Sequence, residues 1–150
     1  MMKHATLEIL SCPDCLAALS LCNERGNVRV EDGILFCSQC ERSFPIWDGI
    51  PHFIEKQQLE GSNRRFAGSY DRLSPFYSFF TKAALLPFGG DRKARKEILS
   101  RLDLNGGRIL EVSIGTGSNL PYLFETPNVG EVYGLDISSG QLTRCCKYAA

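Results

Sequence analysis

Short apolar stretches separated by turn residues make up the first third of the chain, from Leu10 to Ile54. The clearest pattern predicts a β-hairpin in which residues 27–31 and 34–37 are the strands and Asp32-Gly33 is the turn, because glycine accepts the positive φ that such turns need. Residues 1–54 are therefore predicted to form a small β domain.

The spacing of apolar residues becomes helical after residue 55. Residues 55–69 are polar and interrupted by glycine, which is typical of a linker, and residues 70–88 are rich in aromatic and apolar side chains with two prolines, which favours one or two short buried helices. A longer helix is predicted from Asp91, as its N-cap, and its apolar face comprises Ala94, Ile98, Leu99 and Leu102.

Two strands and two helices are predicted to alternate in the last third. Residues 108–113 form a buried strand, a glycine loop follows, and residues 118–124 form a short helix. Residues 131–136 form the second strand, and either Ser138 or Ser139 caps a last helix that is still running at Ala150. This order is the opening of a parallel α/β sheet.

The expected fold class is therefore α/β: a small β domain followed by the first part of a doubly wound, Rossmann-like parallel sheet. Such a sheet needs about five strands with helices on both faces. Residues 70–150 are accordingly expected to be the N-terminal part of a longer domain, and the chain by itself an incomplete and inactive fragment.

The amino-acid composition indicates the class of protein, its expected location and the state of its cysteines. The 150 residues carry 17 basic and 17 acidic side chains and are 43% hydrophobic, as in globular proteins. No stretch has the roughly 20 apolar residues of a membrane span, and Lys3, His4 and Glu8 interrupt any secretory signal, so a cytoplasmic location is expected. Because thiols stay reduced there, the seven cysteines indicate a metal site more than disulfides.

Four of the cysteines form two Cys-x2-Cys pairs, Cys12 with Cys15 and Cys37 with Cys40, which are separated by 21 residues. Two such knuckles place four thiolates around one tetrahedral zinc ion, as in zinc ribbons, and leave no open coordination position. We expect a structural zinc on these four residues. The remaining cysteines are interpreted as small buried apolar residues: Cys22, Cys145 and Cys146.

Three segments of the β domain resemble a known family: residues 7–15 (LEILSCPDC), 35–40 (LFCSQC) and 44–51 (FPIWDGIP). They are similar to the zinc-ribbon activating subunit of tRNA and release-factor methyltransferases, which also occurs as stand-alone bacterial proteins and in front of methyltransferase domains. The resemblance implies that the ribbon, residues 1–54, docks a protein partner or substrate.

A glycine loop, Gly115-Thr-Gly117, directly follows the first strand of the α/β part. Glycines let the backbone approach a ligand, and Asp136, at the end of the next strand, is placed to accept hydrogen bonds from ribose hydroxyls. A dinucleotide site is disfavoured because Leu120 stands where its third glycine would be.

The same segment resembles the first motif of class I S-adenosylmethionine-dependent methyltransferases, an acidic residue followed by Gly-x-Gly-x-Gly. Here the acidic residue is Glu111, and Ser113 replaces the first glycine, ahead of Gly115 and Gly117. The resemblance implies that S-adenosylmethionine binds with its ribose on Asp136 and its adenine against Ile137. Residues 66–71 (FAGSYD) are similar to a helix of the ubiquinone-biosynthesis-like methyltransferases, which implies that Tyr70 approaches the methionine end.

Two functions remain open. The first is methyl transfer from S-adenosylmethionine to a small molecule or an RNA, with catalytic residues unknown because the family takes them from later strands. The second is a non-catalytic, protein-binding zinc ribbon with a vestigial α/β segment. The net charge of the ribbon disfavours RNA as its ligand. Its four basic and seven acidic residues give −3, before the four thiolates of the zinc site are counted.

Overall fold

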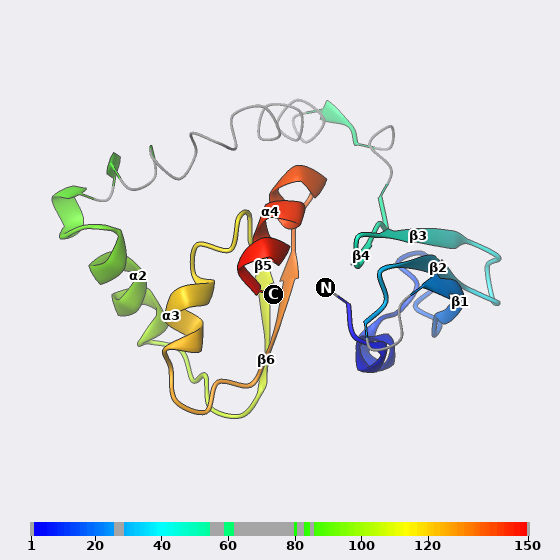
Figure 1. The fold of residues 1–150 in the computed structure, drawn as a ribbon, viewed down its shortest axis with the longest axis horizontal. Coiled ribbons are helices and arrows are strands. Elements are labelled where there is room, and N and C mark those ends of the chain that lie inside the picture. The colour runs from blue at the N-terminus through cyan, green and yellow to red at the C-terminus, as the bar shows by residue number, and fades with distance from the viewer. Residues whose placement is uncertain are drawn as a thin grey trace. The chain divides into compact units, whose positions relative to one another are not determined.

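A computed structural model describes residues 2–25, 29–54, 59–61, 80, 83–84 and 86–149. The chain divides into two compact units, Met1–Glu60 and Gly61–Ala149. Figure 1 shows the ribbon of each unit. Of the residues expected to form the linker and the first helices, 55–58, 62–79, 81–82 and 85 lie outside the described part of the chain.

The first unit is an antiparallel sheet with strand order β1-β2-β3-β4, preceded by a short 3-10 helix. In β3 the buried side chains Phe44 and Ile46 alternate with exposed or partly exposed ones, the period-2 pattern of a half-buried strand. The bounds are η1 His4–Ile9, β1 Ser20–Arg25, β2 Asp32–Phe36, β3 Ser43–Trp47 and β4 Ile50–Pro51.

The predicted hairpin turn is wrong. Asp32 and Gly33 lie inside β2, which pairs with β1 on one side, with Leu21 opposite Leu35, and with β3 on the other. The segment before β2 pairs elsewhere: the N–H of the fully buried Val30 donates to the Met2 carbonyl at 3.1 Å. The pairing that buries Val30 and Leu35 prevails over the local turn signal, because apolar burial is the larger contribution to the free energy of folding.

The core of the first unit combines aliphatic residues with two of the knuckle cysteines. Leu35, Ile46, Val30, Cys12 and Cys37 are all fully buried. A metal centre that is built into so small a core contributes directly to the stability of the unit.

The second unit contains a two-stranded parallel sheet, β5-β6, whose partners run from Arg108 opposite Glu131 to Val112 opposite Leu135. The predicted alternation of strands and helices is confirmed, and the chain is of mixed α/β class. The bounds are η3 Leu86–Phe88, α2 Asp91–Leu99, β5 Arg108–Val112, α3 Leu120–Phe124, β6 Glu131–Leu135 and α4 Ser139–Ala149.

Helix α2 differs from its prediction at both ends. Gly90 is the N-cap and Asp91 is the first helical residue, where its carboxylate accepts a hydrogen bond from Arg95. The helix ends at Leu99, and the expected apolar face is largely uncovered, since Ile98 is 65% exposed. Leu99 packs against the core. Leu102, beyond the end of the helix, is 55% exposed.

Strand β5 is buried on one face only, contrary to the prediction of a buried strand. Ile109 packs on the core of the second unit, whereas Leu110 and Val112 are 59% and 68% exposed. The buried core of this unit comprises Leu104, Ile114, Leu120, Leu123 and Cys145. The alternation follows from the two-residue period of a strand on which the described helices pack from one side.

Of the two residues predicted as possible caps of the last helix, the structure selects the first. The Ser138 hydroxyl accepts a hydrogen bond from the Gln141 N–H at 3.2 Å, so Ser138 is the N-cap of α4. No helix among the residues that the structure describes has the length and apolar character to cross a membrane.

Candidate functional site

The two cysteine knuckles have the same local geometry. In each, a tight turn spans the Cys-x2-Cys pair, and the residue after the second cysteine has positive φ: Leu16 at 61° and Glu41 at 59°. The Cys12 N–H donates to the Ala17 carbonyl at 2.8 Å, and the Cys37 N–H donates to the Arg42 carbonyl at 2.9 Å. These turns direct both thiols of each knuckle toward one point.

The four predicted metal ligands are brought together. The Sγ atoms of Cys12, Cys15, Cys37 and Cys40 all lie within 4.8 Å of one another. Across the two knuckles, Cys12 Sγ is 3.5 Å from Cys40 Sγ, and Cys15 Sγ is 3.4 Å from Cys37 Sγ. Four sulfurs at the usual Zn–S distance in a tetrahedron are about 3.8 Å apart, so the arrangement is compatible with a structural zinc.

The thiols of the cluster differ strongly in acidity. A hydrogen bond from the Cys40 N–H is the main cause that lowers the pKa of Cys37 to about 7. For Cys40, a hydrogen bond from the Arg42 N–H lowers the pKa, but burial and the neighbouring sulfurs outweigh it and raise the value to about 12. Because zinc binds thiolates, loading this cluster must release protons.

The other three cysteines were predicted to be small buried residues, and their burial in the structure differs. Cys22 is exposed, so its interpretation as a buried residue is wrong; it lies on β1, which is an edge strand of the sheet. Cys145 is buried, and burial is the main cause that raises its thiol pKa to about 11. Cys146 is partly buried.

The glycine loop of the second unit lies at the carboxyl ends of β5 and β6. The Ile114 N–H donates to the Leu135 carbonyl at 3.0 Å and extends the parallel pairing by one residue. The chain then turns through two residues with positive φ, Gly115 and Gly117. The Gly115 N–H donates to Asp136 Oδ2 at 2.8 Å, and the Ser138 N–H donates to Asp136 Oδ1 at 2.9 Å.

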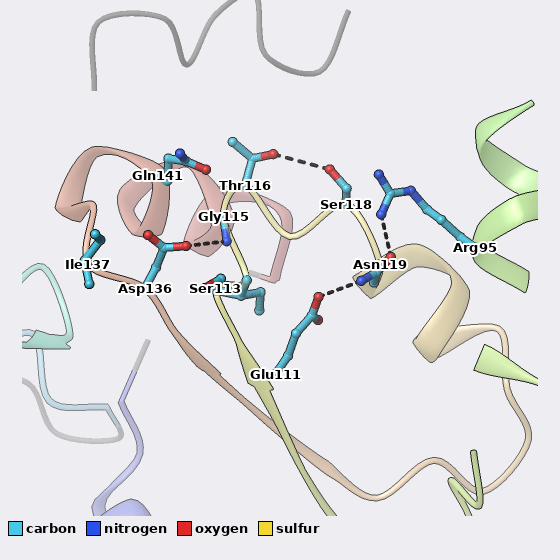
Figure 2. Close-up of a pocket in the computed structure, with 11 residues that line it drawn as sticks. Arg95, Glu111, Ser113, Gly115, Thr116, Ser118, Asn119, Asp136, Ile137 and Gln141 are labelled. Atoms are coloured by element: carbon cyan, nitrogen blue, oxygen red, sulfur yellow. Dashed lines mark hydrogen bonds between the residues drawn. The ribbon is translucent and has the colours of Figure 1, made fainter. Parts of the chain in front are cut away.

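A pocket of about 240 Å³ opens at this loop (Figure 2). Five of the seven residues predicted to contact the cofactor line it: Glu111, Ser113, Gly115, Asp136 and Ile137. The remaining described lining residues are Arg95, Ile114, Thr116, Ser118, Asn119 and Gln141. Gly117 is not among the described lining residues, and Tyr70 lies outside the described part of the chain.

A side chain at Gly115 or at Gly117 would clash with neighbouring atoms, and those atoms differ between the two positions. A Cβ at Gly115 would lie 2.6 Å from Gln141 Oε1, on the pocket side. A Cβ at Gly117 would lie 2.8 Å from both Cys145 Sγ and Leu120 Cδ1, in the core. Gly115 therefore keeps the loop close to α4 at the pocket, whereas Gly117 allows the loop to pack on the helices behind it.

Among the polar lining residues that were not predicted from sequence, Arg95 and Asn119 form a hydrogen-bonded network with Glu111. Arg95, on α2, donates from Nη1 to Asn119 Oδ1 at 2.6 Å, and Asn119 Nδ2 donates to Glu111 Oε1 at 2.6 Å. The i, i+4 spacing of Asp91 and Arg95 is the only sequence signal for this network, and that spacing is common on exposed helices.

The first unit thus has the architecture of a four-cysteine zinc ribbon. Residues 3–49, which include all four cysteines, match the sequence model of the family described as Trm112p-like protein. The match ends before the second unit, so it bears on the ribbon and not on the α/β segment. No curated protein matches the chain.

Proposed function

We propose that the N-terminal unit is a zinc-dependent docking module that binds a methyltransferase and has no catalytic role of its own. The observation that carries the proposal is the cluster of four cysteine sulfurs within the segment that matches the Trm112p-like family, a family of methyltransferase-activating zinc ribbons. Four thiolates complete the coordination of zinc, so the metal would hold the fold and would not bind substrate.

Exposed apolar side chains on the ribbon support docking. Leu16 is 78% exposed, Trp47 57% and Ile54 56%, and the Trp47 ring packs on the His52 ring with centroids 4.6 Å apart. Large aromatic and aliphatic side chains of this kind dominate the centres of protein interfaces. A cytoplasmic location, where thiols stay reduced and available to zinc, suits this function.

The test is complex formation with the catalytic subunit of a tRNA or release-factor methyltransferase from the same organism. We expect a 1:1 complex with the zinc-loaded chain and none after chelation, and Trp47→Ala to weaken it at least tenfold. Phe124→Ala, which removes a 55% exposed aromatic residue of the other unit, is the matched control. Equal affinity of the chelated and zinc-loaded chains would overturn the proposal.

A second function is proposed for the α/β unit: it is the first part of a Rossmann-like methyltransferase domain that binds S-adenosylmethionine. The observation that favours it is the placement of Gly115 and Asp136 at the carboxyl ends of adjacent parallel strands, where open α/β sheets bind their ligands. The acceptor would be a small molecule or an RNA, of which the net charge of the ribbon favours the small molecule.

The residues of this pocket would bind and orient the cofactor. Each Asp136 oxygen already accepts one backbone N–H and retains a second acceptor position for a ribose hydroxyl. Ile137, 46% exposed, offers an apolar surface for the adenine. A bound S-adenosylmethionine supplies an activated methyl group, and the enzyme's main contribution is to align the acceptor and exclude water.

The volume of the pocket sets the expected affinity. At about 240 Å³ it is smaller than the 300–1,000 Å³ or so that usually encloses a ligand of this size. We expect this chain to bind S-adenosylhomocysteine, the stable product, in the millimolar range, with amide shifts at Gly115 and Ser138 in an NMR titration. Absence of shifts at both amides at 5 mM or so would reject the cofactor proposal and leave the docking proposal intact.

A further inference from the structure

One face of the β5-β6 sheet is left uncovered by the described helices. Side chains alternate along each strand, so Ile109 and Val132, which pack on the core of the second unit, lie on the opposite face. The uncovered face carries three exposed aliphatic side chains: Leu110 at 59%, Val112 at 68% and Leu135 at 49%. Neighbouring exposed apolar side chains of this kind indicate a surface that another molecule covers.

The register of the two strands orders this face. Its six side chains form three cross-strand rows: Arg108 with Glu131, Leu110 with Tyr133, and Val112 with Leu135. The first row is charged, since Arg108 Nε lies 3.8 Å from Glu131 Oε2 and the Tyr133 hydroxyl donates to the same oxygen at 2.9 Å. The face is therefore charged where the strands begin and apolar where they end. We call these six residues the open sheet face.

The arrangement of charge favours a second copy of the open sheet face as its partner. When two such faces pack about a twofold axis parallel to the strands, β5 of one copy lies over β6 of the other. Each side chain then meets the other member of its own row, so Arg108 meets Glu131 of the second copy and apolar rows meet apolar rows. A twofold axis perpendicular to the strands would bury each charged row against apolar side chains, which costs free energy.

We propose that the open sheet face is the interface of a symmetric homodimer of this chain, in which β5 of each copy packs over β6 of the other. A stable interface has about 20–30 residues on each side, and the open sheet face is much smaller. The dimer is therefore weak, with a dissociation constant of about 100 µM. Neither proposed function uses these six side chains, so the dimer is tested independently of both.

Sedimentation equilibrium of the 150-residue chain, from about 10 µM to about 1 mM, measures the association. We expect the average mass to rise from the 16.7 kDa of one chain toward twice that value. Val112→Lys should weaken the dimer at least about tenfold, because it places an ammonium group opposite Leu135 of the second copy. Ile98→Lys is the matched control, since Ile98 is 65% exposed but lies on α2, away from the sheet, and it should leave the association unchanged.

Two charge-reversed variants test the orientation of the copies. Arg108→Glu makes both charges of the first row acidic, and Glu131→Arg makes both basic. Each variant alone should dimerise at least about tenfold more weakly than the wild-type chain, because like charges meet across the interface. An equimolar mixture of the two should recover the wild-type affinity, since every acidic side chain then meets a basic one. The recovery should diminish in about 0.5 M salt.

Several results would overturn the proposed dimer. A chain that stays monomeric at about 1 mM has no such interface, and masses that rise beyond the dimer indicate open-ended association instead. Equal association of the wild-type chain and Val112→Lys would place the contact elsewhere on the molecule. A mixture of Arg108→Glu and Glu131→Arg that associates no better than either variant would contradict the pairing of rows, whereas recovery would also show that both variants are folded.

Discussion

The backbone N–H of Gly115 donates a hydrogen bond to Asp136 Oδ2 at 2.8 Å, and this contact ties the glycine loop after β5 to the end of β6. Asp136 also accepts from the Ser138 N–H, one residue before helix α4. The carboxylate therefore organises the loop and the start of α4 before any ligand is present.

Asp136→Asn is expected to destabilise the second unit by about 1.5–3 kcal/mol, because the amide nitrogen must face one of the two N–H donors in place of an acceptor oxygen. Urea unfolding followed by helical circular dichroism measures the loss. Asp103→Asn is the control, since Asp103 is exposed and, among the described residues, accepts a hydrogen bond from the Asn105 N–H alone. Equal stabilities of the two variants would contradict the prediction.

Ser113 occupies the first glycine position of the motif and has a φ of 59°. Residues with a Cβ are strained in this conformation, so Ser113→Gly is expected to stabilise the second unit by about 1 kcal/mol. Urea unfolding also tests this variant. Ser100→Gly, at a right-handed position that ends α2, should be neutral or destabilising, and a gain from both variants would refute the argument.

We predict one tightly bound zinc ion per chain. Cys37→Ser should lose both the metal and the ribbon fold, whereas Cys22→Ser, which changes an exposed cysteine on the same sheet, should keep both. Elemental analysis and amide dispersion in NMR spectra measure the two properties. Zinc occupancy should fall on acidification because protons compete for the thiolates, and a zinc-free but folded Cys37→Ser ribbon would contradict a structural role.

Helices α2 and α3 are joined by an ion pair in which Lys96 Nζ lies 2.6 Å from Glu125 Oε2, with Arg92 3.7 Å from the same oxygen. The hydrogen bond from Lys96 is the main cause that lowers the pKa of Glu125. A lowered carboxyl pKa stabilises the fold above the ordinary value of 4.5, and that contribution disappears as the pH falls through the lowered value.

Glu125→Gln should therefore accelerate amide hydrogen exchange in α2 slightly at pH 7, and this effect should diminish as the pH falls below 4.5 and through the lowered pKa. The difference should shrink in 0.5 M salt, because both partners are about half exposed. Glu97→Gln removes the ion pair with Arg101, four residues further along the chain, and should not affect the contact between α2 and α3. A pH-independent effect of Glu125→Gln would show that packing, and not charge, joins the helices.

Local spacing was enough to predict the parts of the sites that lie close together in the chain. Two residues between cysteines produce a turn that points both thiols the same way, and the structure brings the four predicted ligands within 4.8 Å. An acidic residue at the end of one strand and a glycine loop at the end of the previous one must meet at the same edge of a parallel pair, and Gly115 and Asp136 do so.

Tertiary structure alone decided which segments pair and which faces are covered. Asp32-Gly33 has a local turn signal, yet the burial of Val30 and Leu35 places it inside β2. Leu110 and Val112 are as apolar as Ile109, but the described helices pack on the face of the sheet that carries Ile109. Arg95 reaches the pocket because α2 and α3 pack together, and the free energy of such long-range contacts is not encoded in the spacing of neighbouring residues.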